Sequence, residues 1–179
     1  AAIHRLLEKR NSINYFDHHA ADQQFAHSQL KLHWNPDSQT CTSLLVYEYT
    51  AREFPDWALV GCFGDGLDAR AQRLAEELGV RPDLCRRYCE LGRLINYNAY
   101  GEQIEDLHFS PYLLAEQMRH YRTVDDFIHS SDVFSVLQQG YASDMHELAN
   151  LRPEFINEAV ALYILPDSAC ARRLSGSLA

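Results

Sequence analysis

The fold is decided by the stretch Ile13-Asn14-Tyr15-Phe16-Asp17-His18-His19, in which a short apolar run ends abruptly in one carboxylate and two imidazoles. Buried strands of parallel sheets are short apolar runs, and ligands collect where such strands end. Successive side chains of an extended segment point to opposite sides, so we expect His18 and His19 to have separate roles, one toward a metal and one toward a substrate. A solvated turn is the competing interpretation, and the neighbouring elements decide between the two.

A second apolar run predicts another buried strand. Residues 57–63, Trp-Ala-Leu-Val-Gly-Cys-Phe, are bounded by Pro55 and Gly64 and are followed by an acid, Asp65. Between the two runs, residues 40–54 have the wide apolar face of a helix. A right-handed crossover from strand through helix to strand places both strand ends at the same edge of a parallel sheet.

The convergence of these two strand ends predicts a site that combines His18, His19 and Asp65. The predicted fold class is therefore α/β, a parallel sheet with helices on both faces.

The rest of the chain is predicted to be mostly helical. We expect a C-terminal part of a catalytic domain over residues 1–80, a helical connecting region over 81–155, and the start of a second α/β domain over 156–179. Further elements follow from apolar periodicity and capping residues. They are a helix end at 3–10, a loop or short helix at 20–28, a strand at 30–34, helices at 68–78, from Pro82 through Leu94, from Pro111 and after Thr123, and a strand at 159–165.

Composition bounds the function classes. The chain has 179 residues with a net charge of −9, which argues against a broad non-specific nucleic-acid surface, although it leaves room for a local basic groove. No apolar run approaches the roughly 20 residues of a membrane helix. Five cysteines without C-x-x-C spacing argue against a full disulfide framework, so a reducing cytoplasm is the simplest compartment. We expect an internal piece of a longer protein, because the first residues already have helical spacing.

Five further residues are candidates for substrate binding. Asn96 and Asn98 lie in an aromatic and amide-rich break whose polar groups suit phosphate or base contacts, and His108 precedes a helix start, where an anion can bind. Arg172 and Arg173 would meet phosphate if a second domain closed over the site. The competing interpretations are a structural loop for the amides, and a solvated strand edge for the arginines.

Three stretches in this order resemble the DHH phosphoesterase superfamily, which is named for its Asp-His-His motif. The downstream asparagines are similar to an Asn-containing stretch of its exonuclease branch, and residues 94–98 and 171–176 resemble a group of proteobacterial DHH proteins. The three stretches are residues 14–19 (Asn-Tyr-Phe-Asp-His-His), 40–48 (Thr-Cys-Thr-Ser-Leu-Leu-Val-Tyr-Glu) and 61–65 (Gly-Cys-Phe-Gly-Asp).

The resemblance implies a role for each residue of the motifs. The family binds two divalent metals, usually Mn²⁺ with Mg²⁺ as the alternative, and His18 and Asp65 match its metal ligands. His19 matches the histidine that faces the substrate phosphate, and Asp17 the residue that orients its neighbours. The implied substrates carry a phosphate, such as single-stranded nucleic-acid ends, short oligonucleotides or small nucleotides.

The sequence lacks part of the family pattern, and this difference leads to two hypotheses. The family's Asp-x-Asp pair and a further strand-end Asp belong N-terminal to the motif, and residues 1–16 contain no Asp. The first hypothesis is a metal-dependent phosphoesterase that becomes complete only in a longer parent protein, with this chain alone inactive. The second is a catalytically incomplete fragment or regulatory module that binds a nucleotide or a protein partner. The oligomeric state stays open.

Overall fold

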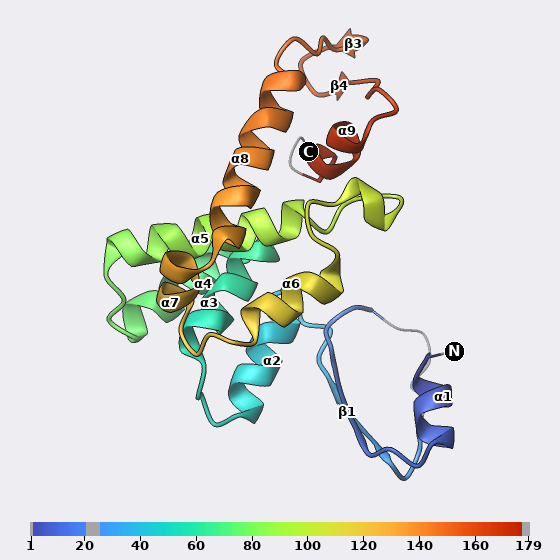
Figure 1. The fold of residues 1–179 in the computed structure, drawn as a ribbon, viewed down its shortest axis with the longest axis vertical. Helices are drawn as coiled ribbons and strands as arrows, with labels where there is room; N and C mark the ends of the chain where they lie inside the picture. Colours follow the sequence, from blue (N-terminus) through green and yellow to red (C-terminus); the bar gives the residue numbers. More distant parts are fainter. Residues whose placement is uncertain (1, 21–25, 177–179) are drawn as a thin grey trace.

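The computed structural model describes residues 2–20 and 26–176, and it is a mixed α/β protein that is mostly helical (Figure 1). The loop or short helix predicted at 20–28 lies largely outside the described residues. The elements are α1 (Ala2–Glu8), β1 (Ile13–Asp17), β2 (Leu30–Trp34), α2 (Thr42–Tyr49), α3 (Pro55–Gly64), α4 (Asp68–Glu77), α5 (Pro82–Tyr97), η1 (Ile104–Asp106), α6 (Pro111–Met118), α7 (Val124–Ser130), α8 (Asp132–Glu147), β3 (Phe155–Ile156), β4 (Ala161–Leu162) and α9 (Ala169–Leu174).

The two predicted N-terminal strands form a parallel pair. β1 runs beside β2 in a register that places Ile13 opposite Leu30 and Asp17 opposite Trp34. The ring of Phe16 stacks on that of His33 at a centroid distance of 4.4 Å, and Phe16 also meets Tyr49 of α2 edge-on. The strand that carries the Asp-His-His motif is therefore held against the helical body by aromatic contacts.

The strand predicted at residues 57–63 is wrong, because this segment lies inside helix α3. Pro55 occupies a first-turn position, where its missing N–H costs nothing. The helix packs against α2, α4 and α5, so apolar side chains are buried all around it and the run is continuous rather than periodic. In the described part of the chain, the sheet that contains β1 has two strands and no crossover through residues 57–63, so the expected sheet with helices on both faces is absent there.

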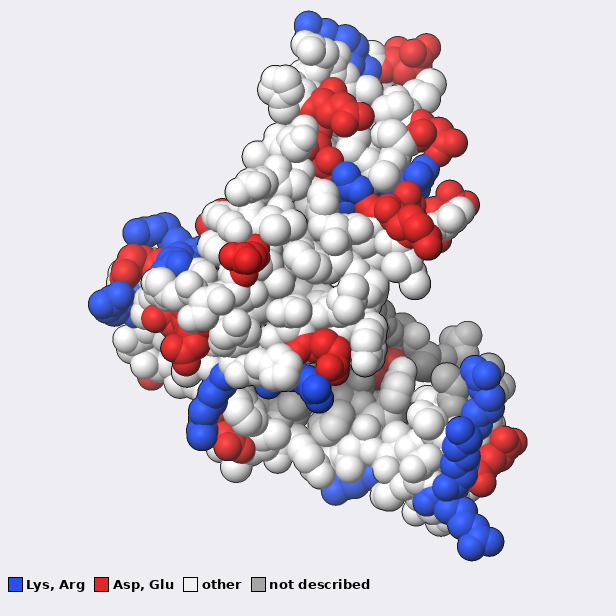
Figure 2. Space-filling view, in the orientation of Figure 1, with Lys and Arg blue, Asp and Glu red and all other residues white. Residues whose placement is uncertain are grey.

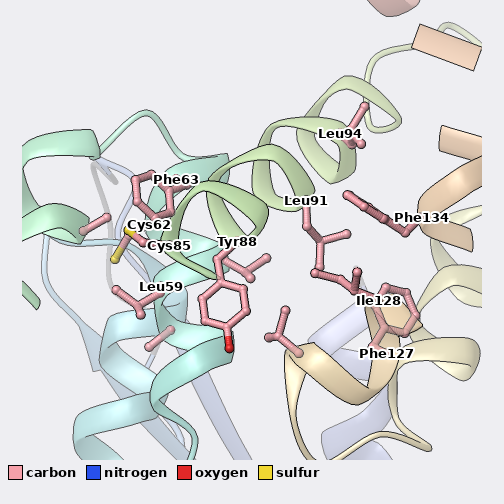
Figure 3. Close-up of a cluster of buried hydrophobic side chains, with 14 of the residues drawn as sticks. Leu59, Cys62, Phe63, Cys85, Tyr88, Leu91, Leu94, Phe127, Ile128 and Phe134 are labelled. Carbon is pink, nitrogen blue, oxygen red and sulfur yellow. The ribbon is translucent and has the colours of Figure 1, made fainter. Parts of the chain in front are cut away.

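Helix α5 organises the core. Figure 3 shows Tyr88 and Leu91 of α5 between the side chains of α3 and those of α7 and α8. Gly92 permits a close crossing with α3, because a Cβ atom at this position would lie 2.4 Å from the carbonyl oxygen of Val60. Gly64 makes the reciprocal approach to the backbone of Gly92. Helices α3 and α5 thus meet backbone to backbone at this crossing.

The other helices agree with prediction, apart from their ends. The Thr123 cap of α7 is confirmed, because its hydroxyl oxygen accepts a hydrogen bond from the N–H of Asp126 at 3.1 Å. Helix α5 continues to Tyr97, so the aromatic break begins later than expected. The helix expected at 40–54 is shorter, because Ala51 and Arg52 adopt positive φ angles that end it.

The C-terminal segment forms a small hairpin and a short helix. Of the strand predicted at 159–165, only Ala161–Leu162 is extended, and it pairs antiparallel with Phe155–Ile156. Figure 1 shows α8 projecting from the helical body with this hairpin at its far end, and α9 returning toward α5. No helix in residues 2–20 and 26–176 is long and apolar enough to cross a membrane. The three-part domain division stays a prediction.

Candidate functional site

The end of β1 fixes the position of the Asp-His-His motif. The strand ends at Asp17, and the backbone N–H of His19 donates a 3.0 Å hydrogen bond to Asp17 Oδ1. This bond folds the chain into an Asx turn directly after the strand. Tyr15 donates to the other carboxylate oxygen at 3.2 Å, and Trp34 Nε1 donates to the carbonyl of His19 at 2.8 Å. The turn is therefore anchored on both strands.

Asp17 and His19 form a dyad. The ring Nδ1 of His19 lies 2.8 Å from Asp17 Oδ1, whereas its side chain is 78% exposed. The hydrogen bonds from the backbone and the ring of His19 lower the pKa of the Asp17 carboxyl to about 2. Asp17 is therefore a carboxylate at neutral pH that orients the imidazole, and Nε2 of His19 is the ring nitrogen left for a ligand.

Asp65 reaches the motif from the end of α3. It is the C-cap of that helix, and Gly66 follows with φ of 74°, a left-handed conformation that favours glycine. The N–H groups of Gly66 and Leu67 donate to the carbonyls of Phe63 and Cys62, at 3.3 and 2.9 Å. These two bonds are a Schellman motif, which ends the helix at a defined place. Asp65 is therefore held by the turn that terminates α3.

His18 and Asp65 come together across the two elements. His18 Nε2 lies 3.5 Å from Asp65 Oδ2, and the His18 side chain is 19% exposed. The predicted convergence of these residues is confirmed, although it arises from a strand end and a helix end rather than from two strand ends. An imidazole nitrogen and a carboxylate oxygen at this spacing are an ion-pair contact, or two donors for one divalent cation.

His18 and His19 do not point to opposite sides, as an extended chain would require. Their ring centroids are 4.4 Å apart. The reason is that the strand ends at Asp17, one residue before His18, and the Asx turn folds His19 back beside His18. One imidazole faces Asp65 and the other Asp17, so the two rings still have different partners within a single cluster.

A cavity of about 510 Å³ opens beside His18 and Asp65, and Asn96 of α5 also lines it. A larger hollow of about 970 Å³ shares Asp65 and Asn96 with the first. Asn96 is thus the one substrate-binding candidate that the structure places at the same cavity as the metal-ligand candidates. Sequence reasoning missed Cys41, Trp57 and Met118, which line this cavity as well, because no spacing relates them to the motif.

The side chains of Asn98 and His108 have protein partners. Asn98 is buried, donates to the carbonyl of Phe109 at 2.8 Å and accepts from its N–H at 3.1 Å. His108 Nε2 lies 2.7 Å from the hydroxyl of Tyr97, and burial lowers the pKa of the His108 imidazole. Neither lines the cavity of His18, and both instead fasten the loop after α5.

Arg172 and Arg173 are engaged by carboxylates. Arg172 makes two hydrogen bonds to Asp106, at 2.9 and 2.8 Å, which lower the pKa of that carboxyl. Arg173 makes two to the buried Asp144, at 2.7 and 2.8 Å. Neither arginine lines the cavity of His18 and Asp65. These pairs tie α9 to η1 and α8.

The described residues supply only part of a metal site. Within residues 2–20 and 26–176, no group of three or more His, Cys, Asp or Glu side chains is arranged to hold a metal ion. Figure 2 shows Lys and Arg in separate groups on the face it presents, with one gathering over the N-terminal segment. His18 and Asp65 thus fit a divalent cation in chemistry, and supply two donors.

Comparisons with known proteins add no relative. No family model matches the chain, and neither a curated protein nor a solved structure is significantly similar to it.

Proposed function

We propose that this chain carries part of the active site of a metal-dependent phosphoesterase of the DHH type. The observation that supports the proposal best is the approach of His18 Nε2 to Asp65 Oδ2 at 3.5 Å, next to the Asp17–His19 dyad. Two segments distant in the sequence bring together the carboxylate and imidazole donors that Mn²⁺ or Mg²⁺ sites use. The motif resemblance and this contact are independent arguments for the same residues.

The contacts of the residues support a role for each of them in the proposed site. His18 and Asp65 would hold the metal, which supplies a Lewis acid and an activated water when bound. Asp17 accepts a hydrogen bond from Nδ1 of His19 and so fixes the ring, and Nε2 of the imidazolium form would donate a hydrogen bond to a phosphoryl oxygen. Asn96 can offer its amide to the same substrate across the cavity. Further carboxylates from a segment N-terminal to Asp17 would complete the metal site.

This arrangement supports a substrate that carries a phosphate. A phosphodiester or phosphoanhydride is the group that a metal and a neighbouring imidazole would act on together. Single-stranded nucleic-acid ends, short oligonucleotides and small nucleotides all present such a group.

Metal binding is the first test. Titration of the chain with Mn²⁺, followed by electron paramagnetic resonance of the free ion, should show binding that weakens about tenfold or more in His18→Ala and in Asp65→Asn, since each removes one of two donors. His146→Ala is the matched control, because this exposed histidine lies on α8, outside the candidate site. Equal affinity in wild type and both site variants would overturn the assignment of the ligands.

Hydrolysis is the second test. The longer parent protein should hydrolyse bis(p-nitrophenyl) phosphate in the presence of Mn²⁺, and His19→Ala should lower the rate while leaving Mn²⁺ affinity near wild type. That split would place His19 on the substrate side. A rate unchanged in both His18→Ala and His19→Ala would reject the phosphoesterase proposal.

The absence of a third ligand in the described residues favours a second candidate, a catalytically incomplete module that binds a nucleotide or a protein partner. The same two assays separate the candidates. A module would bind a nucleotide, detected by a fluorescent analogue, with no hydrolysis at any Mn²⁺ concentration in the parent protein.

A further inference from the structure

Two buried thiols lie in contact beside the candidate site. Cys41 Sγ and Cys62 Sγ are 3.8 Å apart, and the residues are 2% and 0% exposed. Cys41 is the N-cap of α2, and Cys62 lies near the end of α3. Both are free cysteines, so the pair is a dithiol. This contact is separate from the proposed phosphoesterase chemistry, which uses neither sulfur.

The other three thiols face oxygen atoms instead. The sulfurs of Cys85, Cys89 and Cys170 lie near the side-chain oxygens of Gln72, Asp68 and Ser168 respectively. Among the hydrogen bonds of the described residues, the contact between Cys41 and Cys62 is therefore the one that joins two thiols.

The two sulfurs differ in their surroundings. The hydrogen bond from the Cys62 thiol lowers the pKa of Cys41, and the N–H groups of Leu44 and Ser43 at the start of α2 lower it further. The same contact raises the pKa of Cys62. Cys41 also lines the cavity of about 510 Å³, whereas Cys62 does not. A small oxidant that enters this cavity would therefore reach Cys41 before Cys62.

We propose that Cys41 and Cys62 are a reversible oxidation site, in which a hydroperoxide converts the dithiol to a disulfide. The Cys41 thiolate attacks one oxygen of hydrogen peroxide, the O–O bond breaks, and the leaving hydroxide takes up a proton to form water. Cys41 is now a sulfenic acid. Cys62 then attacks the Cys41 sulfur, the S–O bond breaks, and the proton of the Cys62 thiol leaves with the hydroxide as a second water. Two thiols lose two electrons in total, and the peroxide gains them.

Formation of the disulfide requires the two sulfurs to move closer together. A disulfide has an S–S distance of about 2.05 Å, so the sulfurs must approach from 3.8 Å. The start of α2 already packs tightly on α3, because a Cβ atom at Gly61 would lie 2.0 Å from Ser43 Oγ. The disulfide would therefore form mainly by side-chain rotation together with a slight shift at the first turn of α2. Asp65 follows Cys62 by one turn, so the linkage lies next to the candidate metal ligand.

Thiol mapping tests the proposal on the intact protein. The protein is treated with hydrogen peroxide, quenched, denatured in the presence of a maleimide and digested with trypsin. The expected result is a linked pair of peptides, residues 32–52 and 53–70, with a mass about 2 Da below the sum of the reduced peptides. Two of the five thiols should be lost and should return with dithiothreitol. Oxidation confined to the other three cysteines, or a linkage that joins any other pair, would overturn the proposal.

Variants distinguish the roles of the two sulfurs. In Cys62→Ala, Cys41 has no resolving partner, so it should proceed to sulfinic acid, which dithiothreitol does not reduce. Cys89→Ser is the matched control and should give the same linked peptides as wild type. Absence of any oxidation at Cys41 in Cys62→Ala would contradict the mechanism, in which Cys41 reacts with the peroxide first. If that variant fails to fold, the wild-type map decides, with peroxide treatment in urea as the reference in which the preference for this pair should disappear.

Discussion

Removing one partner of the buried pair of Arg173 and Asp144 should be among the most destabilising single substitutions in the fold. The two residues are 9% and 5% exposed and share two hydrogen bonds of 2.7 and 2.8 Å. Asp144→Ala leaves the guanidinium buried, with neutral partners only, the Tyr97 hydroxyl and the Asp106 carbonyl. Removing one partner of a buried ion pair costs about 3–5 kcal/mol. For a chain of this length the midpoint of thermal unfolding should fall by about 6–20 °C.

The double variant separates the charge from the packing. Arg173→Met with Asp144→Leu removes both charges and fills the space with apolar atoms, so no buried charge is left alone. We expect its free energy of unfolding to lie within about 2 kcal/mol of wild type, well above that of either single variant. The difference between the double variant and the sum of the single variants measures the coupling of the pair.

Urea unfolding followed by circular dichroism gives these free energies. Glu48→Gln is the matched control, because its ion pair with Arg52 is exposed on both sides, at 54% and 66%. Such an exposed pair contributes little to stability, because water screens the attraction between its charges. Single variants that lose no more than this control, or a double variant that loses the full sum, would refute the reasoning.

Three further predictions concern the core, the loop after α5 and the motif. Gly92→Ala should cost about 1–3 kcal/mol, because its Cβ would press on the Val60 carbonyl, and urea unfolding measures it. Asn98→Ala should cost about 1–3 kcal/mol by the same assay, because it leaves both backbone groups of Phe109 without partners. In the folded protein the pKa of Asp17 is lowered from 3.8 to about 2. The contribution of the Asp17 carboxylate to folding stability is therefore complete above pH 3.8 and is lost as the pH falls toward 2. NMR titration of the carboxyl group measures this pKa.

Each of these has a contradicting outcome. A stability of Gly92→Ala equal to wild type would show that the crossing of α3 and α5 can relax. Asn96→Ala is the control for Asn98→Ala, since Asn96 is less buried and lines a cavity. Similar losses of stability in Asn98→Ala and Asn96→Ala would exclude a role of Asn98 in holding the loop after α5. A titration midpoint of Asp17 near 3.8 would show that the dyad with His19 does not form in solution.

The strands β1 and β2 could be predicted from sequence, whereas helix α3 could not. Alternation over Leu30–Trp34 distinguishes a strand from a helix, because the two periods differ. A continuous apolar run such as residues 57–63 is the same for a buried strand and a buried helix. Pro55 at the start of α3 was a helix signal available in the sequence. The burial of α3 on all sides depends on contacts with other helices, and a local sequence pattern does not contain this information.

The candidate site was predicted in part. The approach of His18 to Asp65 was expected, through a crossover that does not exist in the described residues. The partners of Arg172 and Arg173 were not predicted, because Asp106 and Asp144 lie far from them in sequence. Charged residues at a chain end have the same composition whether they meet solvent, substrate or a buried carboxylate. Only tertiary packing distinguishes these possibilities.

The attachment of the motif to a two-stranded arm has a thermodynamic consequence. Two-stranded sheets are only marginally stable by themselves, whereas Asp65 belongs to the tightly packed α3. The amides of β1 should therefore exchange with deuterium faster than those of α3. A cation that joins His18 to Asp65 can bind only molecules in which the β1–β2 pair is ordered and lies against α3. The apparent affinity for the cation is therefore the intrinsic affinity multiplied by the fraction of such molecules. Binding at this site and protection of β1 are thus two measures of a single equilibrium.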